Sequence, residues 1–216
     1  MLLRFAVLLA VLVGLVAIGA YAVSLDTGAS QKLLSERGPV ERASPLLYLA
    51  GIAAMPFAFG LRGAAARWYV AVVLAFFAFR ELDLDKSLFT LGLLKSRQYL
   101  SDTPVMEKVV GLAIIGLLAA SAVAIAVRHG RSWVVDVFRG RAWAWATGLA
   151  LFFLVTSKTV DGPMRKLAPW GITIDAETKR WIVTYEEIAE LGAAVCLLLA
   201  VVFLIGTGAS RTKAKA

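Results

Sequence analysis

Hydrophobic residues along this chain fall into six long runs separated by short polar segments. A bilayer core of about 30 Å needs about 20 helical residues at about 1.5 Å each, so runs of this length predict membrane-spanning helices. The second and fifth runs are the shortest. The six runs are Leu2–Leu25, Pro45–Leu61, Ala64–Leu84, Val105–Val127, Ala142–Ser157 and Trp181–Thr207. We therefore expect an all-α integral membrane bundle of six transmembrane helices.

The first run has a second interpretation. Arg4 gives it a charged start, and Ala20-Tyr21-Ala22 resembles a signal-peptide cleavage site. Its apolar stretch is nevertheless long enough to span a bilayer, and we expect the helix to be retained. If it were cleaved, five spans would remain.

The composition agrees with lipid as the main solvent. Hydrophobic residues make up 60% of the 216 residues and charged residues 18%, and the mean hydropathy is +0.77. Soluble domains are about 45–50% apolar and about 25% charged. No linker or repeat divides the chain, so we expect one transmembrane domain over residues 1–209 and a basic cytoplasmic tail over 210–216.

The distribution of basic residues predicts the orientation. If the N-terminus is cytoplasmic, the cytoplasmic segments carry ten of the 23 basic residues and one acid, Asp136, which is the positive-inside pattern. Tryptophans mark both proposed surfaces, with Trp68, Trp133, Trp143 and Trp145 at the inner one and Trp170 and Trp181 at the outer one. We expect a multi-pass protein of the bacterial cytoplasmic (inner) membrane with both termini inside.

Several cofactor classes are excluded. One histidine, His129, cannot supply a bis-histidine haem, and one cysteine, Cys196, cannot hold an iron–sulfur cluster. No P-loop or GxGxxG motif indicates a nucleotide. The net charge of +8 follows the membrane topology, so nucleic acid is not an expected partner.

The candidate chemistry lies in carboxylates at three predicted helix ends on the outer face. RELDLDK follows the third run, YEEIAE opens the sixth, and Asp161 follows the fifth. Without His or Cys, such groups suit a hard divalent cation such as Ca²⁺, Mg²⁺ or Mn²⁺. The candidate metal ligands are Glu81, Asp85, Asp161, Glu186, Glu187 and Glu190. A salt-bridge network that fixes helix packing and a proton or transport path remain open as alternatives.

Residues 87–100 are too apolar for a free loop and too short to span the bilayer. They predict an interfacial or re-entrant segment. Its basic residues Lys95 and Arg97, together with Arg80, are candidates for a lipid head group. Further along, Thr103 is expected to cap the fourth helix and Asp175 the sixth.

The R-E-x-D stretch after one helix and the E-E-x-x-E stretch that opens the last resemble motifs of a group of uncharacterised bacterial polytopic inner-membrane proteins. The resemblance covers roughly residues 76–199 and implies a small polytopic membrane protein without an assigned activity. From the residues, we expect the carboxylate cluster to bind a cation, a lipid head group or a partner subunit. A membrane-embedded enzyme acting on a lipid or its head group and a proton- or cation-coupled transporter are the alternatives, so whether the chain is an enzyme stays open.

Overall fold

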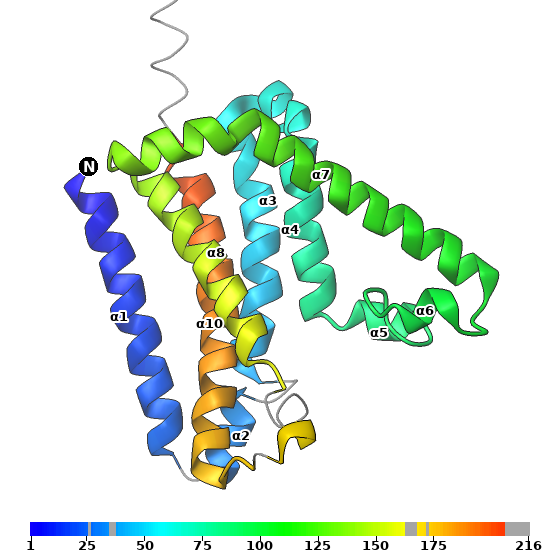
Figure 1. The fold of residues 1–216 in the computed structure, drawn as a ribbon. Helices are drawn as coiled ribbons and strands as arrows, with labels where there is room; N and C mark the ends of the chain where they lie inside the picture. Colours follow the sequence, from blue (N-terminus) through cyan, green and yellow to red (C-terminus); the bar gives the residue numbers. More distant parts are fainter. Residues whose placement is uncertain (26, 35–37, 163–167, 172, 206–216) are drawn as a thin grey trace, which may run out of the picture.

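The computed structural model describes residues 1–25, 27–34, 38–162, 168–171 and 173–205, and all regular structure in these ranges is helical. Most of the long helices run side by side, whereas the helix over Val105–Phe138 crosses them obliquely (Figure 1). The elements are α1 (Leu2–Ser24), α2 (Thr27–Leu34), α3 (Pro39–Ala66), α4 (Trp68–Glu81), α5 (Leu84–Leu88), α6 (Arg97–Leu100), α7 (Val105–Phe138), α8 (Ala142–Val160), the 3-10 turn η1 (Ala168–Trp170) and α10 (Ala176–Val202).

Helix α10 occupies the centre of the bundle and packs against α8, α3 and α1. Small residues make this close packing possible, because they let helix backbones approach one another. A Cβ atom on Gly192 would lie 3.0 Å from the Phe153 ring and 3.2 Å from Leu15, so α8 and α1 both press against this position. Ala193, Ala194 and Cys196 on the same helix are fully buried.

The beginning of α1 and the end of α10 lie at the same end of the bundle. The Arg4 guanidinium donates a hydrogen bond to the carbonyl of Phe203, and Met1 lies close to Gly140 in the α7–α8 turn. Asp136 is buried nearby, where it forms an ion pair of 3.2 Å with Arg141. We call this the basic end, and it also carries the α3–α4 turn and its arginine Arg67 (Figure 1).

Four segments of the described chain are long and apolar enough to cross a membrane. They are α1, the stretch that contains α3, α7 and α8. The structure therefore supports a helical membrane protein, but it does not confirm the six-span count.

Two expected spans differ from the prediction. The expected third span is represented by α4, which has 14 residues, or about 21 Å of helix. It is short because α3 continues to Ala66 after a break at Gly60 (φ 71°), so the chain turns back later than its apolar run predicts. The sixth span, α10, is long enough but carries three glutamates in its middle turns. Two further helices are longer than their expected runs. Helix α3 begins at Pro39 rather than at Pro45, and α7 continues to Phe138 rather than ending at Val127.

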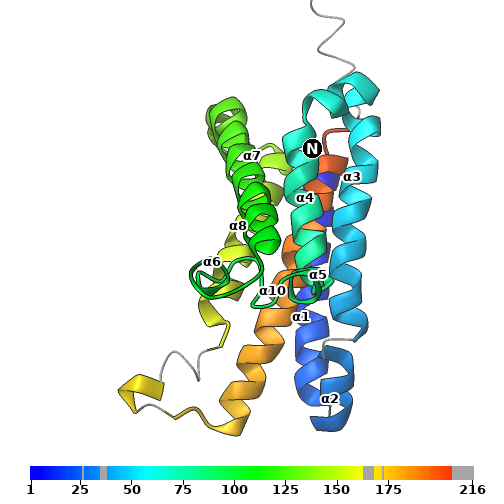
Figure 2. The same cartoon turned by 90° about the vertical axis from the view of Figure 1, so that its right-hand side faces the viewer.

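Helices α3 and α7 lie on opposite sides of α4 (Figure 2). Near the basic end, the Tyr69 hydroxyl on α4 is 2.8 Å from His129 Nε2 on α7. At the end of the bundle away from the basic end, α4 and α7 are joined by residues 82–104. We call these residues the connecting segment.

The connecting segment is folded around a polar network that joins Gln98 and Thr90 to Glu107. The Glu107 carboxylate, in the first turn of α7, accepts hydrogen bonds from the Thr90 backbone N–H (2.8 Å), the Thr90 hydroxyl (3.0 Å) and Gln98 Nε2 (2.7 Å). Gln98 and Leu93 are fully buried. Thr103 does not cap α7 as expected, because its hydroxyl donates to the carbonyl of Gln98 instead. Its two helices, α5 and α6, are too short to cross a membrane, as the length of the apolar stretch predicts.

Candidate functional site

Carboxylates from three helices come together at the end of α4. Glu41 lies in the first turn of α3, Glu81 in the last turn of α4, and Glu187 and Glu190 on α10. Glu81 interacts electrostatically with both Glu190 and Glu41, and Glu187 with Glu190, Glu41 and Glu81. We call these four residues the glutamate cluster. The central position of α10 is what brings them together, since α10 lies between α8 and α3, and α3 packs against α4.

Positive charges balance part of the cluster. Lys158, near the end of α8, forms an ion pair of 2.6 Å with Glu190, whose side chain is 17% exposed, and it lies 4.0 Å from Asp161. Arg80 is adjacent to Glu81 along α4 and interacts with it electrostatically. One ion pair between α8 and α10, of the kind that the salt-bridge alternative expects, is therefore part of the cluster.

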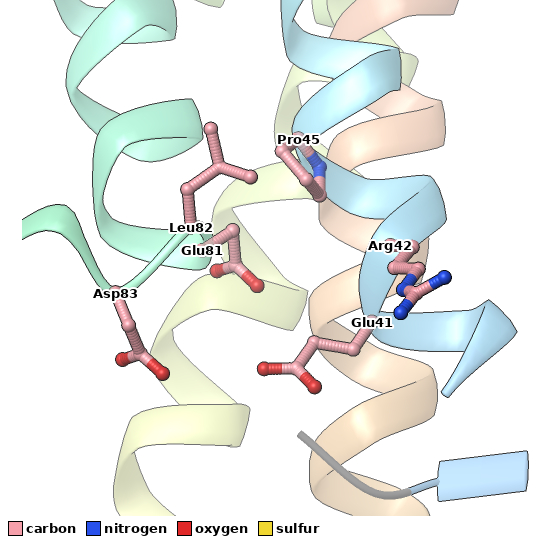
Figure 3. Close-up of a pocket in the computed structure, with 6 residues that line it drawn as sticks. All are labelled: Glu41, Arg42, Pro45, Glu81, Leu82 and Asp83. Carbon is pink, nitrogen blue, oxygen red and sulfur yellow. The ribbon is translucent and has the colours of Figure 1, made fainter. Parts of the chain in front are cut away.

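Two residues of the cluster, Glu41 and Glu81, line a pocket of about 170 Å³ between α3 and the end of α4. The lining residues are Glu41, Arg42, Pro45, Glu81, Leu82 and Asp83. Figure 3 shows the carboxylates of Glu41 and Glu81 directed toward each other across this space, whereas the Arg42 guanidinium turns away from it. We call this space the acidic pocket.

The local backbone adds to the negative potential of the acidic pocket. Glu81 and Leu82 form the C-terminal end of α4, where carbonyl groups point outward and the helix dipole is negative. Asp83 has a left-handed backbone conformation (φ 51°), which turns the chain from α4 into α5. Its carboxylate is paired with Lys86 at 2.6 Å. A carboxylate at a helix C-terminus is unfavourable by itself, so Glu81 is best stabilised by a positive group.

The predicted metal ligands are only partly brought together. Glu81, Glu187 and Glu190 belong to the cluster, and Glu186 interacts with Glu187. Asp161 meets the cluster through Lys158, whereas Asp85 lies on α5 near Gly92. Within the described ranges, no group of three or more His, Cys, Asp or Glu side chains is arranged to hold a metal ion. The donor geometry therefore gives the divalent-cation hypothesis no support.

The three predicted head-group residues do not form one site. Arg80 is half-buried beside the glutamate cluster, while Lys95 and Arg97 are exposed on the connecting segment. Glu41 was missed by the sequence reasoning, because the expected second span began at Pro45 and α3 begins six residues earlier. Pro39 could have indicated this earlier start of α3, because proline is common at the first position of a helix. The basic tail over 210–216 lies outside the described residues.

Comparisons with known proteins give no family for this chain. No family model matches it, and neither a curated protein nor a solved structure matches it.

Proposed function

We propose that the acidic pocket binds a positively charged organic group, an ammonium or guanidinium, presented to the protein from the membrane surface. The observation that carries the proposal is the position of Glu81. Its carboxylate is at the negative end of α4 and faces Glu41 across a pocket of about 170 Å³. Helix dipole and carboxylates both favour a cation at this place.

An organic cation fits this geometry better than a bare metal ion. A divalent metal needs several oxygen ligands within about 2.0–2.6 Å, which requires carboxylates that converge on one point. The carboxylates here line the walls of a space instead. An ammonium or guanidinium group has several N–H donors that point in different directions, so it can bond to carboxylates on opposite walls.

The depth of the cluster supports a binding role over an incidental surface charge. Glu190 precedes Phe203, at the basic end, by 13 residues, which is about 20 Å of helix. With the basic end on the cytoplasmic side, as the positive-inside pattern predicts, the cluster would lie within the outer part of a bilayer core of about 30 Å. Ionisable groups at such depth are costly unless they are paired, and they commonly mark a functional site.

The proposal is tested by ligand-induced stabilisation. The purified protein in detergent micelles is heated with ethanolamine or agmatine, and with propanol as an uncharged control. Binding to the folded state raises the melting temperature. We expect both cations to stabilise the parent protein, and propanol to have no effect. The Glu81→Gln variant should lose the response, and Glu177→Gln, on the exposed first turn of α10, should keep it.

Two further arms distinguish the source of the cationic group. Stabilisation by phosphatidylethanolamine at concentrations where free ethanolamine has no effect would assign the group to a lipid head group, and the reverse result would assign it to a small soluble amine. The proposal is wrong if no amine stabilises the parent, or if Glu81→Gln responds as the parent does. It is also wrong if Ca²⁺ or Mg²⁺ stabilises the parent and a chelator abolishes that effect while the amines do nothing.

A further inference from the structure

Basic side chains gather at the basic end, where α7 passes the α3–α4 turn (Figure 1). Arg67 lies in that turn, and Arg128 precedes His129 on α7. Both arginines interact electrostatically with His129. The Nε2 atom of His129 lies 2.8 Å from the hydroxyl of Tyr69, in the first turn of α4. We call Arg67, Arg128 and His129 the basic cluster.

Aromatic rings support both guanidinium groups of the basic cluster. Arg128 Cζ lies 5.2 Å from the centre of the Tyr69 ring, and Arg67 Cζ lies 4.4 Å from the centre of the Phe59 ring. Arg67 also donates a hydrogen bond of 3.0 Å from Nη1 to the carbonyl of Gly63. Because an arginine has five N–H donors, this bond occupies only part of its capacity. A guanidinium that is already held in position loses less freedom when it binds an anion.

The positive charge of the basic cluster is not balanced by a nearby carboxylate in the sequence. No Asp or Glu occurs over residues 43–80 or 108–135. The next acid along α7, Asp136, is about two turns beyond His129 and is paired with Arg141 at 3.2 Å. Within the described ranges, neither Arg67 nor Arg128 forms an ion pair. Like charges held close together are unfavourable, so an anion between them would be stabilising.

The surroundings favour a phosphate group as this anion. Trp68, beside Tyr69, is 47% exposed, and tryptophans at the ends of membrane helices lie at the level of the lipid head groups. The arginine fork matches the geometry of phosphate oxygens and can form two parallel hydrogen bonds with them. Arg128 is exposed and Arg67 is half-buried, so a group at the membrane surface can reach both.

We propose that the basic cluster binds a phosphate group, with Arg67 and Arg128 as its principal ligands and His129 as a third donor. The Tyr69 hydroxyl engages Nε2 of His129, which leaves Nδ1 as the ring nitrogen that can donate to the phosphate. A phospholipid head group and a soluble phosphate compound offer the same chemistry. The site is independent of the acidic pocket, which lies at the other end of α4.

The test is thermal unfolding of the purified protein in detergent micelles and phosphate-free buffer. A ligand that binds the folded state raises the melting temperature, and a titration gives its affinity. Dioctanoyl phosphatidic acid should stabilise the parent protein. Dioctanoylglycerol, which has the same acyl chains but no phosphate, should have no effect.

Two glutamine variants locate the site. Arg128→Gln should weaken binding of phosphatidic acid by about tenfold or more, because it removes hydrogen bonds between charged groups. Arg139→Gln is the matched control, since it removes an exposed arginine at the same end of the bundle but outside the basic cluster, and it should bind as the parent does. The exposed position of Arg128 makes loss of folding an unlikely complication, and Arg67→Gln provides a second variant with the same expected loss.

A lysine variant separates geometry from charge. Arg128→Lys keeps the positive charge but lacks the planar fork, so its affinity should lie between those of the parent and Arg128→Gln. Inorganic phosphate distinguishes the source of the group. If phosphatidic acid acts at concentrations where inorganic phosphate has no effect, the ligand is a lipid head group. Equal action at equal concentration assigns the site to a soluble phosphate compound.

Three results would overturn the proposal. The first is that neither phosphate compound raises the melting temperature of the parent. The second is an equal loss of affinity in Arg128→Gln and Arg139→Gln, since binding would then depend on the overall charge of the basic end. The third is equal stabilisation by dioctanoylglycerol and phosphatidic acid, which would mean that the acyl chains are what the protein binds.

Discussion

Replacing Lys158 by methionine should destabilise the bundle by removing the partner of a largely buried carboxylate. Lys158 on α8 contacts Glu190 on α10 at 2.6 Å, and the two side chains are 35% and 17% exposed. Methionine keeps most of the length of the lysine chain, so the loss of packing is small. Glu190 would then face the neighbouring carboxylate of Glu81 with less compensating charge.

The expected magnitude lies between two known limits. Exposed ion pairs contribute about 0.2–1 kcal/mol, and breaking a fully buried pair costs about 3–5 kcal/mol. Because this pair is partly exposed, we expect about 2 kcal/mol, from those same limits. For a chain of this size, that corresponds to a fall in melting temperature of about 4–8 °C.

The assay is thermal unfolding in detergent micelles at neutral pH, followed by circular dichroism. Lys86→Met is the matched control, since its ion pair with Asp83 has the same length of 2.6 Å but both side chains are well exposed. The control should lose less than about 1 kcal/mol. The double variant Lys158→Met, Glu190→Gln should recover stability, because it removes the unpaired charge.

Equal losses in Lys158→Met and in Lys86→Met would refute the reasoning, since burial would then have no influence on the pair. Failure of Glu190→Gln to improve the Lys158→Met background would refute it as well, because the cost could not come from an uncompensated carboxylate.

Three further predictions concern the connecting segment and the start of α10. Glu107→Gln removes charge-assisted hydrogen bonds at the base of α7, so amide hydrogen exchange should accelerate over residues 84–104 but not in α8. Gly111→Ala should lower the melting temperature because its methyl group would overlap Tyr99, and an unchanged melting temperature would contradict the close contact. Hydrogen bonds from Thr178 lower the pKa of Asp175, so this cap stabilises the fold above the ordinary aspartate pKa and loses its effect as the pH falls through the lowered value. Asp175→Ala should therefore melt earlier than the parent at pH 7, and a difference that persisted undiminished at strongly acidic pH would contradict the cap.

Local features of the chain were predicted well from the sequence. Asp175 caps α10 as expected, since its carboxylate accepts a hydrogen bond from the backbone N–H of Thr178. The cap is local because the two residues are three positions apart. The starts of α1, α7 and α8 also agree with the expected runs. A membrane-spanning helix must satisfy its backbone hydrogen bonds within its own segment. The position and length of an apolar run therefore indicate where such a helix lies.

Helix ends set by packing were predicted less well. The run that begins at Ala64 contains the turn at Arg67, and apolar composition does not distinguish the last turn of one helix from the first turn of the next. The hydrogen bonds of Gln98 and Glu107 inside the connecting segment were not anticipated either, since they join side chains whose contact depends on the folded path of residues 82–104.

The sequence by itself determined the class of protein, the approximate helices and the presence of carboxylates near three helix ends. It could not determine that Glu81, Glu187 and Glu190 meet, or that Glu41 joins them, because helices that are apolar on nearly all sides carry little information about their neighbours. The tertiary structure decided this by placing α10 between α8 and α3, which pairs Lys158 with Glu190 and leaves Glu41 and Glu81 to line the acidic pocket. Such contacts join residues far apart in the sequence, such as Glu81 and Glu187, and they depend on the close approach of helices at small residues such as Gly192 and Ala194.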